Sequence, residues 1–206
     1  MKTVELFSGT KSFSKVAEKL GYSTYTIDND KKLEPDLCQN LFFIEKVDAD
    51  IIWASPPCTA FSVASIGHHW TGGKGAYIPK TEFAELSQEL VKKTIQIIQE
   101  SKPKYWFIEN PRGILRKMPF MKDFNRVTIS YCQYGDTRMK PTDIWTNFTE
   151  WKPRPICKNG DKCHISAPRG SRTGTQGLKN AKDRGVIPPA LFEEIFSQLE
   201  QKLLNP

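Results

Sequence analysis

The sequence has no long apolar run. None of its stretches approaches the roughly 20 apolar residues that cross a bilayer, so we expect no membrane span. The N-terminal residues lack a charged leader and a small-residue cleavage site, which favours a cytoplasmic protein over a secreted one. Internal repeats and low-complexity tracts are also absent. A chain of 206 residues with 38% hydrophobic residues is therefore expected to form one globular domain with a small annex.

Cysteine is scarce, and its number is odd. The chain has five cysteines, which are Cys38, Cys58, Cys132, Cys157 and Cys163. An odd number without an export signal argues against a disulfide framework. We expect buried thiols, metal ligands or a nucleophile.

The positive charge is unevenly distributed along the chain. Residues 150–185 contain nine Lys or Arg and three Asp or Glu, a net charge of +6, whereas the rest of the chain carries +1. A polyanion such as nucleic acid is the natural partner for such a segment. The alternative is a basic surface that faces only solvent, and charge alone does not decide between the two.

Short apolar runs alternate with helical patterns. The expected strands are Thr3–Phe7, Tyr25–Ile27, Ile51–Ala54, Tyr105–Ile108, Val127–Tyr131 and Thr142–Thr146. The expected helices are Ser12–Leu20, Thr81–Glu100 and Ala190–Leu204, with a Gly-rich loop over residues 67–79. This alternation predicts an α/β fold with a mostly parallel sheet that is covered on both faces. Ligands bind at the carboxyl ends of the strands in such sheets.

The chemically distinctive residues follow these strands. Gly9 ends the first strand, and a glycine turn before a helix brings backbone N–H groups towards a ligand. Asp28 ends the second strand, about where nucleotide sites place an acid for the ribose hydroxyls. Cys58 follows two stiff prolines after the third strand, where a nearby helix start would lower the pKa of its thiol. Glu109 ends the fourth, where burial would raise the pKa of its carboxyl group.

In order and spacing, these motifs resemble the DNA (cytosine-5) methyltransferases. The resemblance rests on Phe7-Ser8-Gly9, Pro56-Pro57-Cys58, Glu109-Asn110-Pro111, Tyr134-Gly135 with Thr137-Arg138-Met139-Lys140, and Val186-Ile187-Pro188-Pro189-Ala190-Leu191. It covers about residues 3–147 and 185–204. It implies a Rossmann-like methyltransferase fold that binds S-adenosylmethionine and acts on cytosine in DNA.

The resemblance also implies roles for individual residues. Cys58 would add to cytosine C6, Glu109 would contact N3, and Arg138 and Lys140 would position the base. The cofactor-binding residues implied are Phe7, Ser8, Gly9, Asp28, Asn29, Asp36 and Pro56, with Asp36 at the adenine amino group. The family usually has a second Arg where this chain has Lys140, which cannot make a bidentate fork, so Arg138 is expected to be the main positioning cation.

The chain departs most from the family in size. Residues 1–149 would form the catalytic and cofactor-binding domain, residues 150–185 a basic insert in place of a target-recognition domain, and residues 186–206 a returning helix. Base readout needs several contacts, so we expect short or relaxed specificity, or a partner protein that supplies recognition. Compact forms of this kind resemble phage-encoded methyltransferases, which suggests a bacterial host or a phage-infected cell.

The insert contains two further candidate sites. Cys157, Cys163 and His164 offer thiols and an imidazole to Zn²⁺, although the spacing is not a standard one. No fourth ligand lies nearby unless the fold brings Cys132 close, and unliganded thiols are the alternative. The residues expected to face DNA phosphates are Arg169, Arg172, Lys179 and Lys182.

The Gly-rich loop resembles the family's mobile loop that closes on DNA. Trp70 or a neighbouring histidine would fill the space left by a cytosine that leaves the stack, or else His68 and His69 are simply exposed polar residues. Two other functions stay open at this point. One is the same chemistry on RNA or a free cytosine nucleotide, and the other is a catalytically silent DNA-binding decoy.

Overall fold

The computed structural model describes residues 1–73, 76–166 and 181–204. Its main sheet has seven strands in the order β3-β2-β1-β4-β7-β9-β8. Their bounds are β1 Lys2–Leu6, β2 Ser23–Asp28, β3 Leu37–Cys38, β4 Ile51–Ala54, β7 Tyr105–Pro111, β8 Arg126–Ser130 and β9 Pro141–Thr146. Neighbouring strands from β3 to β7 pair in parallel, and only β9 runs antiparallel to both of its neighbours. The predicted α/β fold with a mostly parallel sheet is confirmed.

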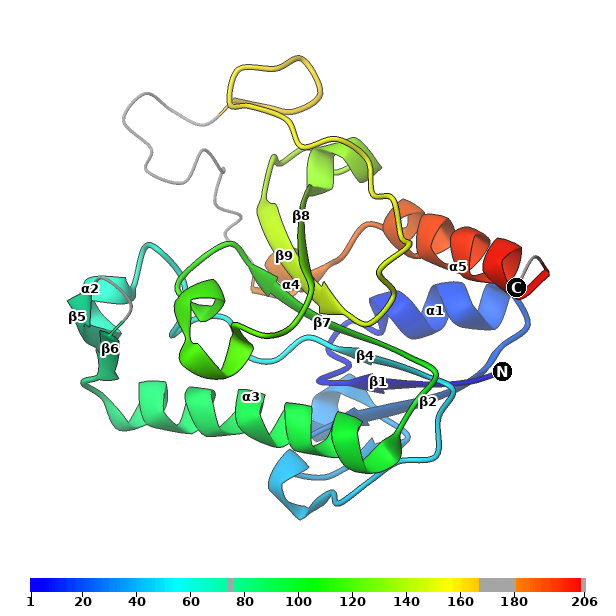
Figure 1. Cartoon of the computed structure of the whole chain (residues 1–206), viewed down its shortest axis with the longest axis horizontal. Coiled ribbons are helices and arrows are strands. Elements are labelled where there is room, and N and C mark those ends of the chain that lie inside the picture. The colour runs from blue at the N-terminus through cyan, green and yellow to red at the C-terminus, as the bar shows by residue number, and fades with distance from the viewer. Residues whose placement is uncertain (74–75, 167–180, 205–206) are drawn as a thin grey trace.

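Helices cover both faces of this sheet (Figure 1). The long helices are α1 Ser12–Lys19, α3 Glu82–Ser101 and α5 Pro189–Leu204, and the short ones are α2 Ile66–His69 and α4 Ala181–Gly185. Helix α3 lies on one face, whereas α1 and α5 lie together on the other. Thr81 caps the start of α3 by accepting a hydrogen bond from the N–H of Ala84, and Pro103 follows its last turn.

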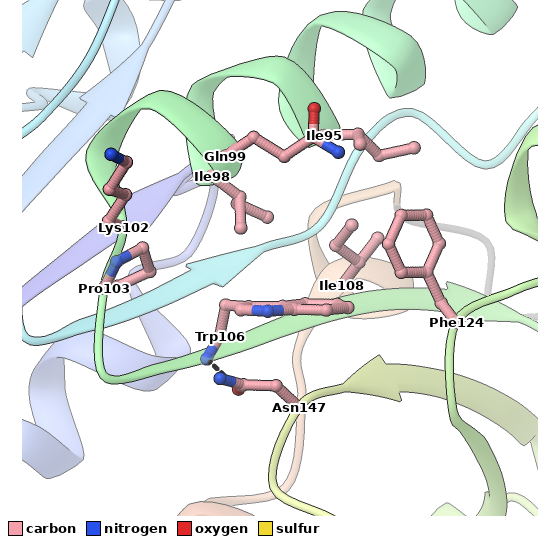
Figure 2. Close-up of a pocket in the computed structure, with 9 residues that line it drawn as sticks. All are labelled: Ile95, Ile98, Gln99, Lys102, Pro103, Trp106, Ile108, Phe124 and Asn147. Carbon is pink, nitrogen blue, oxygen red and sulfur yellow. Dashed lines mark hydrogen bonds between the residues drawn. The ribbon is translucent and has the colours of Figure 1, made fainter.

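Near the C-terminal end of α3, a small apolar pocket opens between this helix and the start of β7 (Figure 2). Ile98 and Pro103 approach the indole ring of Trp106 there, and Asn147 accepts a hydrogen bond from the backbone N–H of Trp106 at 2.9 Å. This pocket lies towards the amino end of β7. It is therefore distant along the strand from Glu109.

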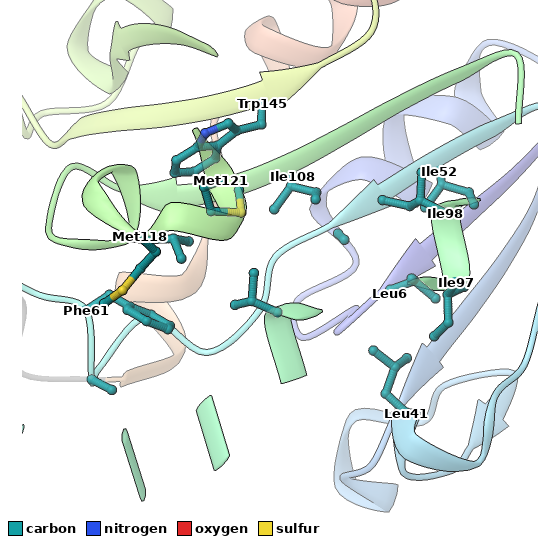
Figure 3. Packing of buried hydrophobic residues seen from close by; sticks show 14 of the residues in the cluster. Leu6, Leu41, Ile52, Phe61, Ile97, Ile98, Ile108, Met118, Met121 and Trp145 are labelled. Carbon is teal, nitrogen blue, oxygen red and sulfur yellow. The ribbon is translucent and has the colours of Figure 1, made fainter. Parts of the chain in front are cut away.

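The core is divided between the two faces of the sheet. The side chains of a strand alternate in direction, so Ile52 and Ala54 of β4 face the α3 layer, whereas Ile51 and Trp53 face α1 and α5. All four residues are buried, which explains why this parallel strand is an unbroken apolar run. Figure 3 shows part of the α3-side cluster, in which Leu6, Ile52 and Ile97 pack together.

The Gly-rich loop contains a small hairpin that sequence patterns did not predict. Strand β5 (Trp70–Gly73) pairs antiparallel with β6 (Ala76–Pro79). Trp70 is only 3% exposed, stacks on Phe61 and donates its indole N–H to the carbonyl of Ala60. The expectation that Trp70 fills a space in the duplex is therefore wrong for this conformation, since Trp70 anchors the hairpin. His68 is exposed and His69 is buried.

The insert has little regular structure where it is described. Residues 150–166 contain no helix or strand, and α4 follows at residues 181–185. Among the described residues, no helix has the length and apolar character needed to cross a membrane.

Candidate functional site

The carboxyl ends of β1, β2, β4 and β7 lie at one edge of the sheet because these strands are parallel. This edge brings together the residues that sequence analysis selected at four separate strand ends. Two adjoining regions result. One is a pocket beside β1 and β2, and the other is a group of titratable side chains beside β4 and β7.

The pocket is narrow and mostly apolar. Its lining residues are Phe7, Ile27, Asp28, Asn29, Gln39, Asn40, Leu41, Phe42, Pro57, Leu86 and Leu90. Three of the seven predicted cofactor residues, Phe7, Asp28 and Asn29, are thus among them. Asp28 accepts one hydrogen bond at each carboxylate oxygen, from the N–H of Gly9 and from the N–H of Asp30, both at 3.0 Å. Each oxygen keeps a lone pair for a ligand.

Three other predicted cofactor residues support the pocket without lining it. Phe7 and Gly9 have φ values of +56° and +46°, so the chain turns sharply after β1, and this turn buries Ser8. Pro56 is also buried, and its carbonyl accepts a hydrogen bond from Asn110, so Pro57 lines the pocket in its place.

Most amides of the glycine turn and of the start of α1 already have partners within the protein. The N–H of Gly9 is bonded to Asp28, and the first amides of α1, on Phe13 and Ser14, donate to the buried Glu5. Burial raises the pKa of Glu5 to about 7. The helix start is therefore already capped from inside the protein.

Asp36 does not line the pocket. Its carboxylate accepts hydrogen bonds from the N–H and hydroxyl of Thr26, at 2.8 and 2.6 Å. Thr26 and Ile27 are neighbours on β2, so their side chains point to opposite faces, and it is Ile27 that lines the pocket. Asn40 lies in the pocket instead, at the start of the 3-10 helix Leu41–Phe43. No sequence motif singled out Asn40 as a pocket residue.

Cys58 lies in a loop that is tied to its neighbours. Asn110 at the end of β7 donates to the carbonyl of Pro56 at 3.0 Å, and the N–H of Ile114 donates to the carbonyl of Phe61 at 3.0 Å. Gly113 sits so close that an added Cβ would lie 2.1 Å from the carbonyl oxygen of Phe61. The loop is therefore held against β7 from both sides of Cys58.

The thiol of Cys58 is half-buried, and no helix begins beside it. Burial raises the pKa of this thiol, and the Glu109 carboxylate raises it further, whereas Lys140 and Arg184 lower it. The expectation that a helix start lowers this pKa is wrong. Cationic side chains from two other segments are what favour the thiolate.

Glu109 is 6% exposed. Tyr131 donates to its Oε1 at 2.9 Å, and the hydroxyl group of Ser55, which itself accepts the indole N–H of Trp53, lowers the pKa of Glu109. Burial raises the pKa of Glu109, and Lys140 opposes this shift. The carboxyl group is thus held in one orientation in a setting that favours its protonated form.

Lys140, and not Arg138, is the cation of this pair that shifts the pKa values of Cys58 and Glu109. The guanidinium of Arg138 is buried and forms a two-point contact with Asp136, through Nε at 2.9 Å and Nη2 at 2.5 Å. Lys140 instead acts on the pKa of both Cys58 and Glu109, lies over the ring of Tyr131 at 4.5 Å, and donates to the carbonyl of Arg184. Asp136 already occupies the fork of Arg138, so Lys140 is the cation of this pair that acts on Cys58 and Glu109, and the role of Arg138 at the base stays a prediction.

We expect replacement of Lys140 by Gln to raise the pKa of Cys58, because it removes a positive charge while Glu109 of β7 and Arg184 of α4 remain. A shift of one unit lowers the thiolate fraction at neutral pH about tenfold. Alkylation of Cys58 by iodoacetamide, followed across pH by peptide mass spectrometry, measures this shift.

Two internal references make the alkylation result specific. Lys140→Arg keeps the charge and should keep the profile of the native chain, and the exposed Cys38 should react equally in all variants. An unchanged Cys58 profile in Lys140→Gln would show that Lys140 does not favour the thiolate.

Arg184 is a site residue that sequence reasoning missed, since nothing in the chain order relates it to Cys58. It belongs to α4, and its side chain lowers the pKa of Cys58. Of the four residues predicted to face phosphates, Arg169, Arg172 and Lys179 lie outside the described residues. Lys182 belongs to α4, but the structure does not describe its side chain.

The predicted metal ligands lie together, and the fold adds a fourth. Cys157, Cys163 and His164 of the insert meet Cys132, which belongs to the 3-10 helix Tyr131–Tyr134 after β8. The ligand atoms of these four residues all lie within 4.8 Å of one another. The sequence allowed a fourth ligand only if the fold brought Cys132 close to the insert, and the fold does so.

Known proteins resemble this chain over most of its length. The model of the C-5 cytosine-specific DNA methylase family matches residues 1–131. The chain is 27% identical over 217 residues to a frog virus 3 (isolate Goorha) protein named "Probable DNA (cytosine-5)-methyltransferase", covering 95% of this chain and 99% of that protein. It also resembles the crystal structure of a prophage-encoded DNA modification methyltransferase (E. coli), with a TM-score of 0.53 and 14% identity over 98% of this chain and 69% of the other.

These findings agree with the strand-end geometry. The structural likeness shows the Rossmann-like methyltransferase fold, and S-adenosylmethionine is the usual cofactor of the family. The chain therefore belongs to the C-5 cytosine-specific DNA methylases, the family of DNA (cytosine-5)-methyltransferases.

Proposed function

We propose that this chain transfers a methyl group from S-adenosylmethionine to cytosine C5 in DNA, through a covalent bond between Cys58 and cytosine C6. The observation that carries this proposal is the group formed by Cys58, Glu109 and Lys140. These residues come from three separate segments. Glu109 and Lys140 each shift the pKa of Cys58, and Lys140 also shifts the pKa of Glu109. A nucleophile, a buried acid and a cation at one edge of the sheet suit addition to an aromatic ring.

The neighbouring pocket suits the adenosyl part of the cofactor. Apolar side chains such as Phe7, Leu41 and Leu86 fit a flat purine, and the unused lone pairs of Asp28 fit ribose hydroxyls. Asn40 supplies an amide that can pair with the edge of adenine, the role first expected of Asp36. Bound S-adenosylmethionine supplies an electrophilic methyl group.

The two carboxylates give a direct test of this assignment. We expect Asp28→Asn to weaken S-adenosylmethionine binding about tenfold, because it removes charge-assisted hydrogen bonds to the ribose. Asp36→Asn should bind as tightly as the native chain, since one amide oxygen can still accept both bonds from Thr26. Isothermal titration calorimetry measures both constants, with thermal melting as the control for folding. Equal weakening by both variants would contradict the pocket assignment.

The reaction begins at cytosine C6, which the Cys58 thiolate attacks with its sulfur lone pair. As the S–C6 bond forms, the electrons of the C5–C6 double bond shift through C4 towards N3, which accepts a proton from Glu109. C5 then forms a bond to the methyl carbon, and the sulfonium sulfur leaves as a neutral thioether. Removal of the C5 proton to a base restores the C5–C6 double bond and expels Cys58 as a thiolate, and N3 returns its proton to Glu109.

The other residues of the site hold these groups in place. Tyr131 and Ser55 orient Glu109 so that a carboxyl oxygen faces the ring. Lys140 and Arg184 stabilise the thiolate before addition, and Arg138, paired with Asp136, supports the loop that leads to Lys140. The cytosine must leave the DNA stack to reach this group, which costs a few kcal/mol.

We further propose that residues 150–185 bind the DNA backbone in place of a target-recognition domain. The net charge of +6 in this segment supports the proposal, and Arg169, Arg172, Lys179 and Lys182 are the candidate phosphate contacts. Residues 1–149 and 186–206 would then form the catalytic unit. A partner protein would be needed only if this short segment gives too few base contacts.

Nucleoside mass spectrometry tests the function. The purified chain is incubated with methyl-labelled S-adenosylmethionine and unmethylated genomic DNA, and parallel reactions contain RNA or free cytosine nucleotides. We expect labelled 5-methylcytosine only from DNA and only with intact Cys58. Label in RNA or nucleotides alone would reassign the substrate. Cofactor and DNA binding without any product would favour the decoy.

A further inference from the structure

The four residues Cys132, Cys157, Cys163 and His164 come from two distant parts of the chain. Cys132 follows β8 in the catalytic part, whereas the other three lie in the described part of the insert. The Sγ atom of Cys132 lies 3.0 Å from that of Cys157 and 3.6 Å from that of Cys163. The Nδ1 atom of His164 lies 3.8 Å from Cys157 Sγ and 3.4 Å from Cys163 Sγ.

Three of these four separations are close to those of ligands around one small ion, and the Cys132–Cys157 separation of 3.0 Å is shorter. Tetrahedral zinc has Zn–S bonds of about 2.3 Å and Zn–N bonds of about 2.0 Å, which separate neighbouring ligand atoms by about 3.5 to 3.8 Å. Three soft thiols with one imidazole form a ligand set typical of structural zinc. We propose that Cys132, Cys157, Cys163 and His164 bind one Zn²⁺ ion, which fastens the basic insert to the catalytic part of the chain.

The surroundings of the cluster suit thiolate ligands. The side-chain amide of Gln133 donates to Cys163 Sγ at 3.4 Å, and such outer contacts orient and stabilise metal-bound sulfur. The N–H of Cys157 donates to Ser130 at 3.3 Å, which holds that ligand beside β8. Three thiolates exceed the charge of one Zn²⁺ by one, and the lysines at 158 and 162 lie in the same short segment to balance it.

A metal ion would hold the insert in place against the catalytic part of the chain. Its residues 150–166 form no helix or strand, and Ile156 and Ile165 are each 59% exposed, so after Trp151 these residues have no apolar core of their own. In small coreless segments, metal binding supplies the folding free energy. A disulfide would join two of the three sulfurs and leave the third thiol and the imidazole converging on nothing.

The cluster also lies between the insert and the residues that surround Glu109. Cys132 directly follows Tyr131, whose hydroxyl holds Glu109. Arg154 of the insert donates to the carbonyl of Gln133 on the other side of Cys132. A metal ion at Cys132 would therefore fix the position of the insert relative to the wall of the active site.

Metal analysis of the full chain tests the proposal. The chain is purified without chelators from cells grown in zinc-containing medium, and inductively coupled plasma mass spectrometry should find about one zinc per chain. Cys132→Ser and Cys163→Ser should lose most of this zinc, whereas Cys38→Ser, which changes an exposed cysteine outside the cluster, should keep it.

Cobalt gives a second measurement that does not depend on the variants. Replacement of zinc by Co²⁺ should give the intense visible bands of tetrahedral cobalt and a near-ultraviolet thiolate-to-cobalt band. Absence of stoichiometric zinc together with absence of these bands would overturn the proposal, as would a disulfide within the cluster found by mass spectrometry. Neither measurement uses DNA or S-adenosylmethionine, so its failure is distinct from a failure of the proposed methylation.

Discussion

Replacing Cys58 by Ala should abolish methyl transfer, with kcat lower by about 10⁴-fold or more. Without the sulfur, no bond forms at C6, and C5 of an aromatic cytosine is too poor a nucleophile to attack the methyl group. Cys58 does not line the cofactor pocket, so S-adenosylmethionine should bind the variant as it binds the native chain. The variant is therefore expected to lose the methyl-transfer step and to keep cofactor binding.

An oligonucleotide that carries 5-fluorocytosine makes the covalent step visible. Fluorine on C5 cannot leave as a proton does, so the adduct persists and appears as a slower band on a denaturing gel. The native chain and the matched Cys38→Ser control should both form this band, and Cys58→Ala should form none. Methylation by Cys58→Ala, or trapping at another cysteine, would contradict the assignment of the nucleophile.

Glu109→Gln should lower kcat by about 10²- to 10⁴-fold, the range expected when a proton donor is lost. The amide has nearly the same size and can still accept the hydrogen bond from Tyr131, but it has no acidic proton for N3. Binding of DNA and S-adenosylmethionine should change little. The loss should thus appear in kcat and not in KM.

The pH dependence separates this role from a structural one. Burial raises the pKa of Glu109, so the protonated form persists to higher pH than in an ordinary carboxyl group. Activity that needs this proton falls as the pH rises past the raised pKa, and Glu109→Gln should lack that fall. Glu89→Gln, on the exposed side of α3, serves as the control. A Glu109→Gln variant with the native kcat and pH profile would remove Glu109 from the mechanism.

The strand-end residues could be predicted because the signals for them are local. An apolar run such as Ile51–Ala54 predicts a buried parallel strand, and parallel strands place their carboxyl ends at one edge. Cys58 and Glu109 are 51 positions apart, but Glu109 directly follows the apolar part of β7, and Cys58 lies four positions after the last residue of β4. Their proximity therefore follows from the sheet and needs no knowledge of side-chain contacts.

The residues that were missed depend on contacts between distant segments. The resemblance implies Asp36 as a cofactor residue, but no motif shows that Thr26 of β2 takes up the carboxylate of Asp36. The resemblance favours Arg138 over Lys140 because a lysine cannot make a bidentate fork, but no motif shows that Asp136 takes up the guanidinium of Arg138. Arg184 lowers the pKa of Cys58 although the two residues are 126 positions apart in the chain. No periodicity or motif records such interactions.

Helix α5 has a consequence for how the chain is made. Phe192 and Phe196 pack against Phe13 of α1, and Phe192 also meets Trp53 edge-on at 4.8 Å. During synthesis, α1 and the strands leave the ribosome before α5 does, so part of this face stays uncovered until α5 emerges. The strands that carry Cys58 and Glu109 therefore complete their core only once α5 has been made, and until then the nascent chain exposes aromatic side chains, a surface that makes folding intermediates prone to aggregation.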